Sequence, residues 1–395
     1  MRLCSVPTAV KFLALLLLAL LIYTAVLRYG GCQYGEKMLK EGYDIQDGCW
    51  TCRCRFGMVS CTEIRGCSNT SNLSMKFAYQ RAAGNDRVVD TGDPTAVHIM
   101  ICSDENTLGG MVALINSIRL HTNTSVIFHL VTDEASHNHL KTWIEQTDLK
   151  GIKREIIVFD ENRVAGKYVV RSSNQRLKSP LNYARFYIPY LLPDFNGRLI
   201  YIDDDCIVQG DIKELAAVSI SDDHLAAFSD DCSAIAKRFN LFRNNFFRFL
   251  NYANERVQKL GISPQTCSFS AGVFVADVKR WREHDVTIKL EYWSELNTRE
   301  NIYGGQDGGG GSQPPMMIVF HNKYSRLDPM WHVRHLGWST GSRYSRQFLQ
   351  EAHLLHWNGG YKPWGSPAQY VDIWDKYYIP DPTRQFKPMR KYKTL

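Results

Sequence analysis

The chain has 395 residues, enough for one large domain or two small ones with a substantial buried core. Its composition, 44% hydrophobic and 22% charged, is that of a globular protein and excludes a chain that is disordered throughout. The formal net charge is +7, but five of the basic residues lie within 384–395. Because a basic tail is usually solvated and the sequence has no zinc-finger spacing or aromatic-basic signature, we set nucleic-acid partners aside.

The N-terminal segment predicts a membrane anchor. Residues 12–27 form an apolar run, almost uninterrupted, between Lys11 and Arg28. A helix of this length covers about 24 Å, close to the core of about 27 Å of an early secretory membrane. The alternative is a cleaved signal peptide, but the small residues that cleavage needs are missing at the candidate sites. We therefore predict a cytoplasmic tail at 1–11 and an uncleaved signal anchor at 12–27.

Two further features predict that most of the chain lies in the secretory lumen. Acceptor sequences for N-glycosylation begin at Asn69, Asn72 and Asn123, and this modification occurs in the lumen. Six of the eleven cysteines fall within 32–67, a density that indicates disulfides in an oxidising compartment. We expect a single-pass type II protein of the Golgi or endoplasmic reticulum membrane.

The clustered cysteines predict a small module at 32–67. Their pairing stays open, because six cysteines allow many connectivities. The spacing around Cys49–Cys54 and Gly57–Cys61 resembles the first half of a von Willebrand factor C module. That resemblance implies an extracellular or lumenal protein partner, although a disulfide-stapled stem spacer is an equally good interpretation. Residues 68–94 are polar with little periodicity, so we predict a linker there.

From residue 97 onward, strand-like and helix-like patterns alternate. Apolar runs predict strands at 97–102, 126–131, 155–159 and 198–202, and periodic patterns predict helices around 111–118, 139–147 and 181–192. This alternation predicts an α/β fold with a mostly parallel sheet flanked by helices. Ligands of such sheets bind at the carboxyl ends of the strands, here after Cys102 and after Ile202.

Three consecutive carboxylates, Asp203, Asp204 and Asp205, follow the predicted strand 198–202. They repel one another unless a cation neutralises them. Since alternate residues of an extended chain point to the same side, Asp203 and Asp205 can converge on one ion while Asp204 faces away. The triplet is therefore a candidate metal site.

A second segment, 354–364, supplies a different ligand type. It contains His356, Gly359 and Lys362 beside two tryptophans. Glycines let the backbone approach a phosphate, and a lysine offers it a point charge. Two carboxylates and one imidazole, completed by diphosphate oxygens and water, suit Mn²⁺ or Mg²⁺ better than tetrahedral Zn²⁺.

Together these motifs carry a family resemblance. Tyr201–Ile212 resembles the metal-binding segment of the family 8 glycosyltransferases, the glycogenin-like group, and His356–Trp364 is similar to that family's diphosphate motif. The resemblance runs from about 97 to 382, includes Asp328–Leu336, and is closest to the animal glycosyltransferase 8 domain-containing proteins.

The resemblance implies a GT-A domain at 95–383, before the basic tail 384–395. It further implies retaining transfer of a hexose or pentose from a UDP-sugar to a glycan or glycoprotein acceptor. Asp203, Asp205 and His356 would hold the metal. The implied substrate-binding residues are Cys102, Ser103 and Asp104 for uridine, Gly359 and Lys362 for the diphosphate, Arg185 near the donor, and Asp204, Ser270, Ala271 and Gly272.

The sequence departs from the family pattern at two places. The family usually has Asn-Ala-Gly or Asn-Ser-Gly where this chain has Ser270–Gly272, and an Asp-Gln pair where it has Ser312 and Gln313. Gln313 is therefore a catalytic candidate, and Asp307 could supply the missing carboxylate by a shift in register. The departures leave an alternative function, a catalytically degenerate nucleotide-sugar-binding scaffold that acts through the cysteine-rich module. A metal-dependent phosphohydrolase is a third interpretation, but it gives the 356–364 segment no purpose.

Overall fold

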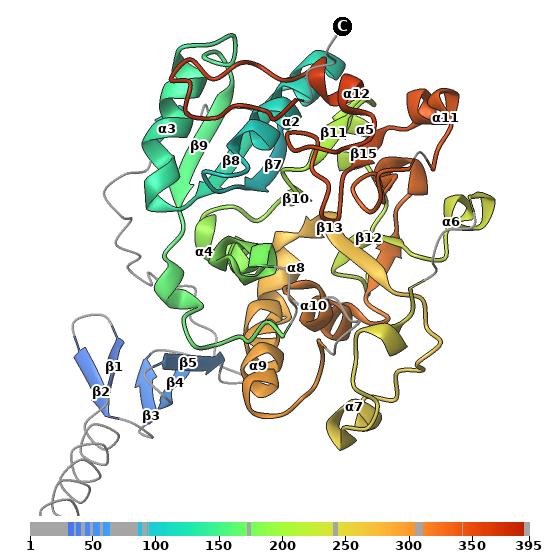
Figure 1. Cartoon of the computed structure of the whole chain (residues 1–395). Helices are drawn as coiled ribbons and strands as arrows, with labels where there is room; N and C mark the ends of the chain where they lie inside the picture. Colours follow the sequence, from blue (N-terminus) through green and yellow to red (C-terminus); the bar gives the residue numbers. More distant parts are fainter. Residues whose placement is uncertain are drawn as a thin grey trace, which may run out of the picture. The chain divides into compact units, whose positions relative to one another are not determined.

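The structure is a computed structural model (Figure 1) that describes residues 31–34, 37–40, 44–47, 50–55, 58–63, 86–88, 93, 95–171, 175–239, 244–304, 311–341 and 343–390. It divides into two compact units, 1–81 and 82–395. The predicted cytoplasmic tail and anchor at 1–27 lie outside the described residues. Within the described ranges, no helix is both long and apolar enough to span a membrane.

The first unit consists of short antiparallel strands. β1 (Gly31–Tyr34) pairs with β2 (Lys37–Lys40), and β3 (Asp44–Asp47), β4 (Trp50–Arg55) and β5 (Met58–Glu63) form a three-stranded sheet. All of these strands lie in or next to the cysteine-rich segment. The cysteine side chains of this unit lie outside the described part of the chain, so the disulfide framework and the von Willebrand factor C module stay predictions.

An eight-stranded sheet forms the centre of the second unit, in the order β14-β12-β13-β10-β7-β8-β9-β6. Four neighbouring strands are parallel: β10 (Arg198–Ile202), β7 (Val97–Cys102), β8 (Val126–Thr132) and β9 (Lys153–Val158). β13 (Phe269–Asp277) runs antiparallel between β10 and β12 (Ala226–Asp230), and β14 (Tyr324–Arg326) lies parallel to β12. A separate pair, β11 (Cys206–Val208) and β15 (Leu354–His356), is antiparallel.

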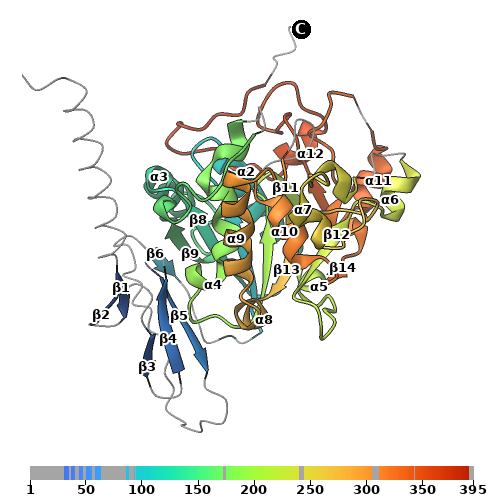
Figure 2. The ribbon, with the colours of Figure 1, turned by 90° about the horizontal axis from the view of Figure 1, so that it is seen from below.

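Helices cover both faces of this sheet. Successive side chains of β7 enter different hydrophobic clusters: Ile99 and Ile101 pack with α2 (Leu108–His121) and α3 (Glu134–Glu145), whereas Met100 packs on the opposite face. Figure 2 shows helices of that opposite face along the sheet. They are the 3₁₀ helix η3 (Pro180–Tyr187), α4 (Ile188–Leu191), α8 (Val278–Glu283), α9 (Val286–Arg299) and α10 (Gln313–Phe320). Burial on both faces explains why the strands read as continuous apolar runs.

Shorter helices complete the unit. The 3₁₀ helices are η1 (Glu161–Arg163), η2 (Gln175–Lys178), η4 (Phe246–Arg248) and η5 (Pro329–His332). The short α-helices are α5 (Ile212–Ala216), α6 (Ala234–Arg238), α7 (Glu255–Lys259), α11 (Arg346–Glu351) and α12 (Val371–Asp375). The α/β fold predicted from the sequence is therefore confirmed.

Helix boundaries differ from the prediction in two places. The helix predicted at 139–147 begins already at Glu134, because the Asp133 side chain accepts a hydrogen bond from the Ser136 backbone and caps the helix at 2.8 Å. The helix predicted at 181–192 is a 3₁₀ helix followed by a single α turn. Pro189 lies in that turn and has no backbone N–H to donate to the preceding turn.

The predicted linker and tail boundaries also need correction. Asp86–Val88, inside the predicted linker 68–94, forms strand β6 and pairs antiparallel with β9 at the sheet edge. In the predicted tail 384–395, Phe386 is buried and the Met389 N–H donates to the Trp364 carbonyl at 2.8 Å. The linker and the tail were predicted from the polar and basic composition of these segments. The domain boundary is instead set by strand pairing at 86–88 and by burial of Phe386. Residues 86–88 and 384–390 therefore belong to the domain.

Candidate active site

A cleft of about 1050 Å³ lies at the carboxyl edge of the parallel strands. Fourteen of the fifteen site residues predicted from the sequence line it: Cys102, Ser103, Asp104, Arg185, Asp203, Asp204, Asp205, Ser270, Ala271, Gly272, Gln313, His356, Gly359 and Lys362. The fifteenth, Asp307, lies outside the described residues. Segments from most of the length of the second unit thus meet in one cleft.

Sheet topology fixes the order of residues across this cleft. Because β12, β10 and β7 run in one direction and β13 runs against them, the ends of the first three reach the edge where β13 begins. Ser103 follows β7, Asp203 follows β10, Ser270 is the second residue of β13 and Asp231 follows β12. With strands about 4.8 Å apart, β7 and β12 are separated by about 14 Å. The cleft therefore has a β7 end and a β12 end.

The acidic triplet divides as the strand alternation predicts. Asp203 accepts from the Arg185 guanidinium at 2.8 Å and from the Tyr201 hydroxyl at 3.1 Å. The Asp204 carboxyl instead interacts with hydroxyls of the β7 loop, those of Thr107 and Ser103. Burial, followed by the negative charge of Asp205, raises the pKa of Asp204 to about 8. Asp204 therefore faces away from the carboxylates on either side of it.

Strand pairing places His356 beside Asp205. β15 pairs antiparallel with β11 so that His356 lies opposite Cys206. The imidazole Nε2 atom is 2.8 Å from Asp205 Oδ1 and 3.9 Å from Asp203 Oδ2. This β15–β11 pairing, which the sequence patterns do not reveal, joins the two predicted motifs.

A second histidine supports the first. His332 Nε2 lies 2.8 Å from His356 Nδ1, and the two rings stack with centroids 5.1 Å apart. Burial, followed by the charge of Arg334, lowers the pKa of His332 well below its ordinary value, so this imidazole is neutral. Its contact fixes the orientation of the His356 ring. The sequence interpretation gave His332 no role, although it lies in the family-like segment Asp328–Leu336.

Lys362 contacts a carboxylate. Its ammonium group forms an ion pair with Asp205 and donates to the Trp357 carbonyl at 3.1 Å. Burial alone would raise the pKa of Asp205, but His356 and Lys362 outweigh it and hold that pKa below its ordinary range. Asp205 is therefore an ionised carboxylate whose partners are Lys362 and His356. Lys362 thus lies directly at the predicted metal site.

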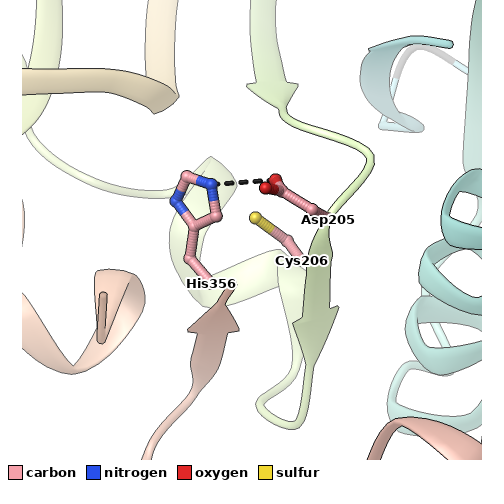
Figure 3. Close-up of side chains that lie close together, drawn as sticks. All are labelled: Asp205, Cys206 and His356. Carbon is pink, nitrogen blue, oxygen red and sulfur yellow. Dashed lines mark ion pairs between the residues drawn. The ribbon is translucent and has the colours of Figure 1, made fainter. Parts of the chain in front are cut away.

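The donor atoms at this point fit a divalent cation. Among the described residues, Asp205, Cys206 and His356 form the group whose potential ligand atoms all lie within 4.8 Å (Figure 3). The 2.8 Å between Asp205 Oδ1 and His356 Nε2 is close to the spacing of about 3 Å between adjacent ligands of an octahedral ion with bonds of about 2.1 Å. Asp205 Oδ1 is buried at this point, next to the imidazole nitrogen.

Cys206 is the weak member of that group. Burial, reinforced by the Asp205 charge, raises the pKa of its thiol well above the ordinary value, so the sulfur stays protonated and ligates poorly. Asp203, whose Oδ2 atom is 3.9 Å from the imidazole, is the better third ligand for a hard ion. The predicted set Asp203, Asp205 and His356 thus fits Mn²⁺ or Mg²⁺.

Two glycines keep this region open. A Cβ atom at Gly272 would lie 2.5 Å from His356 Cε1 and 2.7 Å from Asp203 Oδ2, so a side chain there would displace both. Gly359 has φ +111°, a backbone conformation that favours glycine, and a Cβ atom there would lie 2.6 Å from the Gly337 carbonyl oxygen. Both predicted glycine positions are therefore structurally required.

Arg185 and Gln313 organise the start of β13. Arg185 is buried, stacks over the Tyr201 ring with its guanidinium carbon 4.4 Å from the centroid, and donates to the Ala271 carbonyl at 2.7 Å. Gln313, the first residue of α10, accepts from the Ala271 N–H at 3.4 Å. These contacts fix the position of Arg185. Arg185 in turn orients Asp203 through its hydrogen bond to that carboxylate. Ser270, which departs from the family pattern, and Ser312 are both buried in the cleft wall.

The β12 end contains an ion pair that the sequence did not reveal. Asp231 Oδ1 lies 2.5 Å from Arg334 Nη1, and Arg334 also donates to the Asp230 carbonyl at 3.0 Å. Asp231 further accepts from the Ser268 hydroxyl. A disulfide between Cys232 and Cys267, with Cα atoms 5.9 Å apart, borders this pair. The thiols of Cys102 and Cys206, in contrast, are free and buried.

Comparisons with known proteins agree with the fold and with the family resemblance. Residues 98–368 match glycosyl transferase family 8. The chain is 44% identical over 302 residues to glycosyltransferase 8 domain-containing protein 1 of Danio rerio, covering 75% of this chain and 81% of that protein. It is 42% identical over 308 residues to the Homo sapiens protein of that name, covering 77% and 83%.

Two solved structures share the fold at low sequence identity. Galactosyltransferase LgtC, in complex with donor and acceptor sugar analogues, is 17% identical to this chain, with a TM-score of 0.54. The match covers 73% of this chain and 100% of the LgtC chain. The bifunctional glycosyltransferase WbbM is 21% identical with a TM-score of 0.53, covering 75% and 52%. The predicted GT-A arrangement is thereby confirmed.

Proposed function

The chain belongs to glycosyl transferase family 8, and from that premise we propose that it is a retaining, metal-dependent transferase that moves a hexose or pentose from a UDP-sugar to a glycan or glycoprotein acceptor. The observation that most supports this is the meeting of two distant motifs. Lys362 contacts Asp205 across 157 residues of sequence, beside His356. Such a cluster of carboxylates, imidazole and ammonium suits a metal-bound diphosphate.

The order of residues across the sheet gives the proposed orientation of the donor. Uridine lies at the β7 end on Cys102, Ser103 and Asp104, and the diphosphate lies beyond it at the carboxylates that follow β10. The transferred sugar then lies near Ser270 and Gln313, which line the next stretch of the cleft. Ser270 offers one hydroxyl where the family pattern has an amide. Its hydrogen bond to the sugar therefore reaches less far than that of an asparagine side chain.

The chain's own charges assist departure of the diphosphate. Asp203, Asp205 and His356 would hold Mn²⁺ or Mg²⁺, which would supply positive charge to offset the negative charge of the leaving diphosphate. Lys362 carries an ammonium on a flexible stem, and it donates to diphosphate oxygens as a point charge. His332 keeps the His356 ring oriented through its 2.8 Å contact. Fixed groups of this kind stabilise developing negative charge without having to reorganise during the reaction.

The proposed location is the lumen of the Golgi or endoplasmic reticulum, with residues 12–27 as the anchor of a type II protein. Asn123, in one of the glycosylation sequences, is exposed in the loop between α2 and β8. An exposed loop is accessible to the modifying enzyme. Mass spectrometry of the protein from secretory membranes, before and after removal of N-glycans, tests this location.

Calorimetry and a donor screen on the purified full-length protein test the activity. UDP should bind in a Mn²⁺-dependent manner, and at least one UDP-sugar should be consumed. The double variant Asp203→Ala and Asp205→Ala should lose turnover by about a thousandfold or more. The matched control is Asp223→Ala, a carboxylate whose side chain is 81% exposed and which lies outside the cleft.

Unchanged turnover in the double variant would refute the enzyme proposal. UDP binding by the unmodified protein without consumption of any donor would favour the alternative, a nucleotide-sugar-binding scaffold that acts through its cysteine-rich module.

A further inference from the structure

A buried histidine lies between two carboxylates near the β7 end of the cleft. His139 belongs to α3, and its side chain is 4% exposed. Its Nδ1 atom lies 2.6 Å from Glu105 Oε1, and its Nε2 atom lies 3.0 Å from Asp381 Oδ2. Glu105 belongs to the loop after β7, and Asp381 belongs to the C-terminal segment 379–390. His139 therefore connects that loop to the C-terminal segment.

The partners of His139 determine how many protons its ring carries in this arrangement. Ionised carboxylates accept hydrogen bonds but do not donate them. The Thr383 hydroxyl lies 3.2 Å from Nε2, but it donates its own hydrogen to Asp381 at 2.9 Å, so it too accepts from the ring. A neutral imidazole has one N–H, whereas an imidazolium has two. Both carboxylate contacts are therefore hydrogen bonds only when the ring carries both protons.

The two carboxylates differ in their freedom to move. The Asp381 side chain is fully buried and accepts from the backbone N–H groups of Phe386 at 2.8 Å and Thr383 at 2.9 Å. Burial alone would raise the pKa of Asp381, but these hydrogen bonds outweigh it and lower that pKa. Asp381 thus stays ionised and in place. The Glu105 side chain is 42% exposed and can turn to water instead.

Glu105 lies in a turn whose neighbouring residues line the cleft. The turn 104–107 is closed by a hydrogen bond from the Thr107 N–H to the Asp104 carbonyl at 2.9 Å. Asp104, Asn106 and Thr107 line the cleft, whereas Glu105 is not among the lining residues. Glu105 therefore acts on the cleft through the turn, which its contact with His139 ties to the rest of the domain.

The other groups around His139 come from its own helix and from the C-terminal segment. The imidazole stacks on the Trp143 ring of α3 with centroids 5.5 Å apart. Asp133, which caps α3, adds negative charge near Asp104, and Tyr378 lies within electrostatic reach of Asp381. Among the described residues, the ion-pair partners of the ring are Glu105 and Asp381.

We propose that His139 is a positioning residue for the donor: as an imidazolium it ties Glu105 to Asp381 and so fixes the turn 104–107. Loss of the second proton releases Glu105 and loosens the turn. The protein then binds the donor more tightly in a mildly acidic compartment than in an alkaline one. This regulation rests on the proposed function, because it assigns the turn to the donor's uridine.

The first test replaces the histidine. Glutamine presents one nitrogen and one oxygen and gains no proton, so in His139→Gln one of the two carboxylates meets an acceptor. UDP binding to the full-length protein is measured by calorimetry with Mn²⁺. At about pH 5.5 the variant should bind UDP about tenfold more weakly than the unmodified protein, and at about pH 8 equally well. Proteins are compared at the same pH, because UDP and the metal site titrate in all of them.

The second test replaces Glu105 and has the opposite expected result. In Glu105→Gln the amide accepts from an imidazolium and donates to a neutral imidazole, so the turn stays tied in both states. This variant should match the unmodified protein at about pH 5.5 and bind UDP about tenfold more tightly at about pH 8. A merely structural role of the pair predicts no gain in affinity.

The matched control is His137→Gln. His137 is also a buried histidine of α3, but its Nδ1 atom lies 3.4 Å from Asn138 Oδ1, an amide oxygen. UDP affinity of this variant should equal that of the unmodified protein at both pH values. Urea unfolding shows which variants are folded. If His139→Gln does not fold, Glu105→Gln still decides, because it changes a partly exposed side chain.

Two outcomes would overturn the proposal: Glu105→Gln gains no affinity for UDP at the alkaline pH, or a folded His139→Gln weakens UDP binding by the same factor at both pH values. Failure of the unmodified protein to bind UDP at either pH is a separate result, and it counts against the proposed function instead.

Discussion

The two ends of the cleft treat buried charge in opposite ways. At the donor end, Asp203 and Asp205 share a small space with Lys362, His356 and Arg185, whereas Asp204 faces the hydroxyls of Ser103 and Thr107. At the β12 end, the Asp231 carboxylate and the Arg334 guanidinium form an ion pair. The first arrangement gathers carboxylate and imidazole atoms that can ligate a cation, whereas the charges of the second are already paired with each other.

Removing one member of the Asp231–Arg334 ion pair should have the largest effect on stability. Arg334→Met leaves Asp231 buried without its cation, so the free energy of unfolding should fall by about 3–5 kcal/mol. Urea denaturation measures it. The control is Arg326→Ala, which breaks the 2.9 Å pair with Asp230 at a side chain that is 76% exposed and should cost less than about 1 kcal/mol. Equal, small effects of the two variants would contradict the comparison.

At the donor end, replacing the ionisable Asp204 carboxyl by a neutral amide should stabilise the protein at high pH. The pKa of Asp204 is raised to about 8 in the folded protein, above its unfolded value, so the unmodified protein loses stability as pH rises from about 4 to about 8. Asp204→Asn removes that loss. In the presence of a chelator, the variant should match the unmodified protein at pH 4 and exceed it at pH 8 by on the order of 2 kcal/mol.

Thermal or urea unfolding across that pH range checks the Asp204 prediction. A variant that is less stable than the unmodified protein at pH 8 would show that the charged carboxyl is favoured there.

The smallest effect concerns metal affinity. His332→Phe removes the partner of His356 Nδ1 while keeping an aromatic ring, so Mn²⁺ affinity measured by calorimetry should fall about 10–100-fold. His353→Phe is the control, because the His353 ring stacks on the Trp331 ring with centroids 5.0 Å apart, whereas it is His332 that contacts His356 Nδ1. An unchanged affinity in His332→Phe would assign that histidine to packing alone.

Much of this molecule is predictable from its sequence, for a physical reason. The parallel strands are buried on both faces, so each appears as an uninterrupted apolar run with sharp ends, and β7 and β10 lie where the runs place them. The triplet 203–205 and the segment 354–364 are local patterns whose chemistry can be recognised without a fold. Fourteen predicted residues accordingly line one cleft.

What the sequence did not reveal are contacts between distant single residues. Arg334 and Asp230 are 104 positions apart and His332 and His356 are 24 apart, and none of these residues belongs to a pattern that names its partner. The predicted ends of the linker and of the tail were wrong for the same reason. Val88 pairs with Arg154 in the sheet, and Phe386 is buried, although both lie in segments of polar or basic composition. Such contacts follow from the tertiary structure alone.

The packing around the start of α2 has a consequence for synthesis of the protein. Gly109 and Gly110, in the first turn of that helix, lie against the rings of Phe386 and Trp364 respectively. During synthesis this helix is made more than 200 residues before Trp364 and Phe386, the two aromatic residues that cover it. The packing around the start of α2, and with it this wall of the cleft, is therefore completed only after residue 386 has been made.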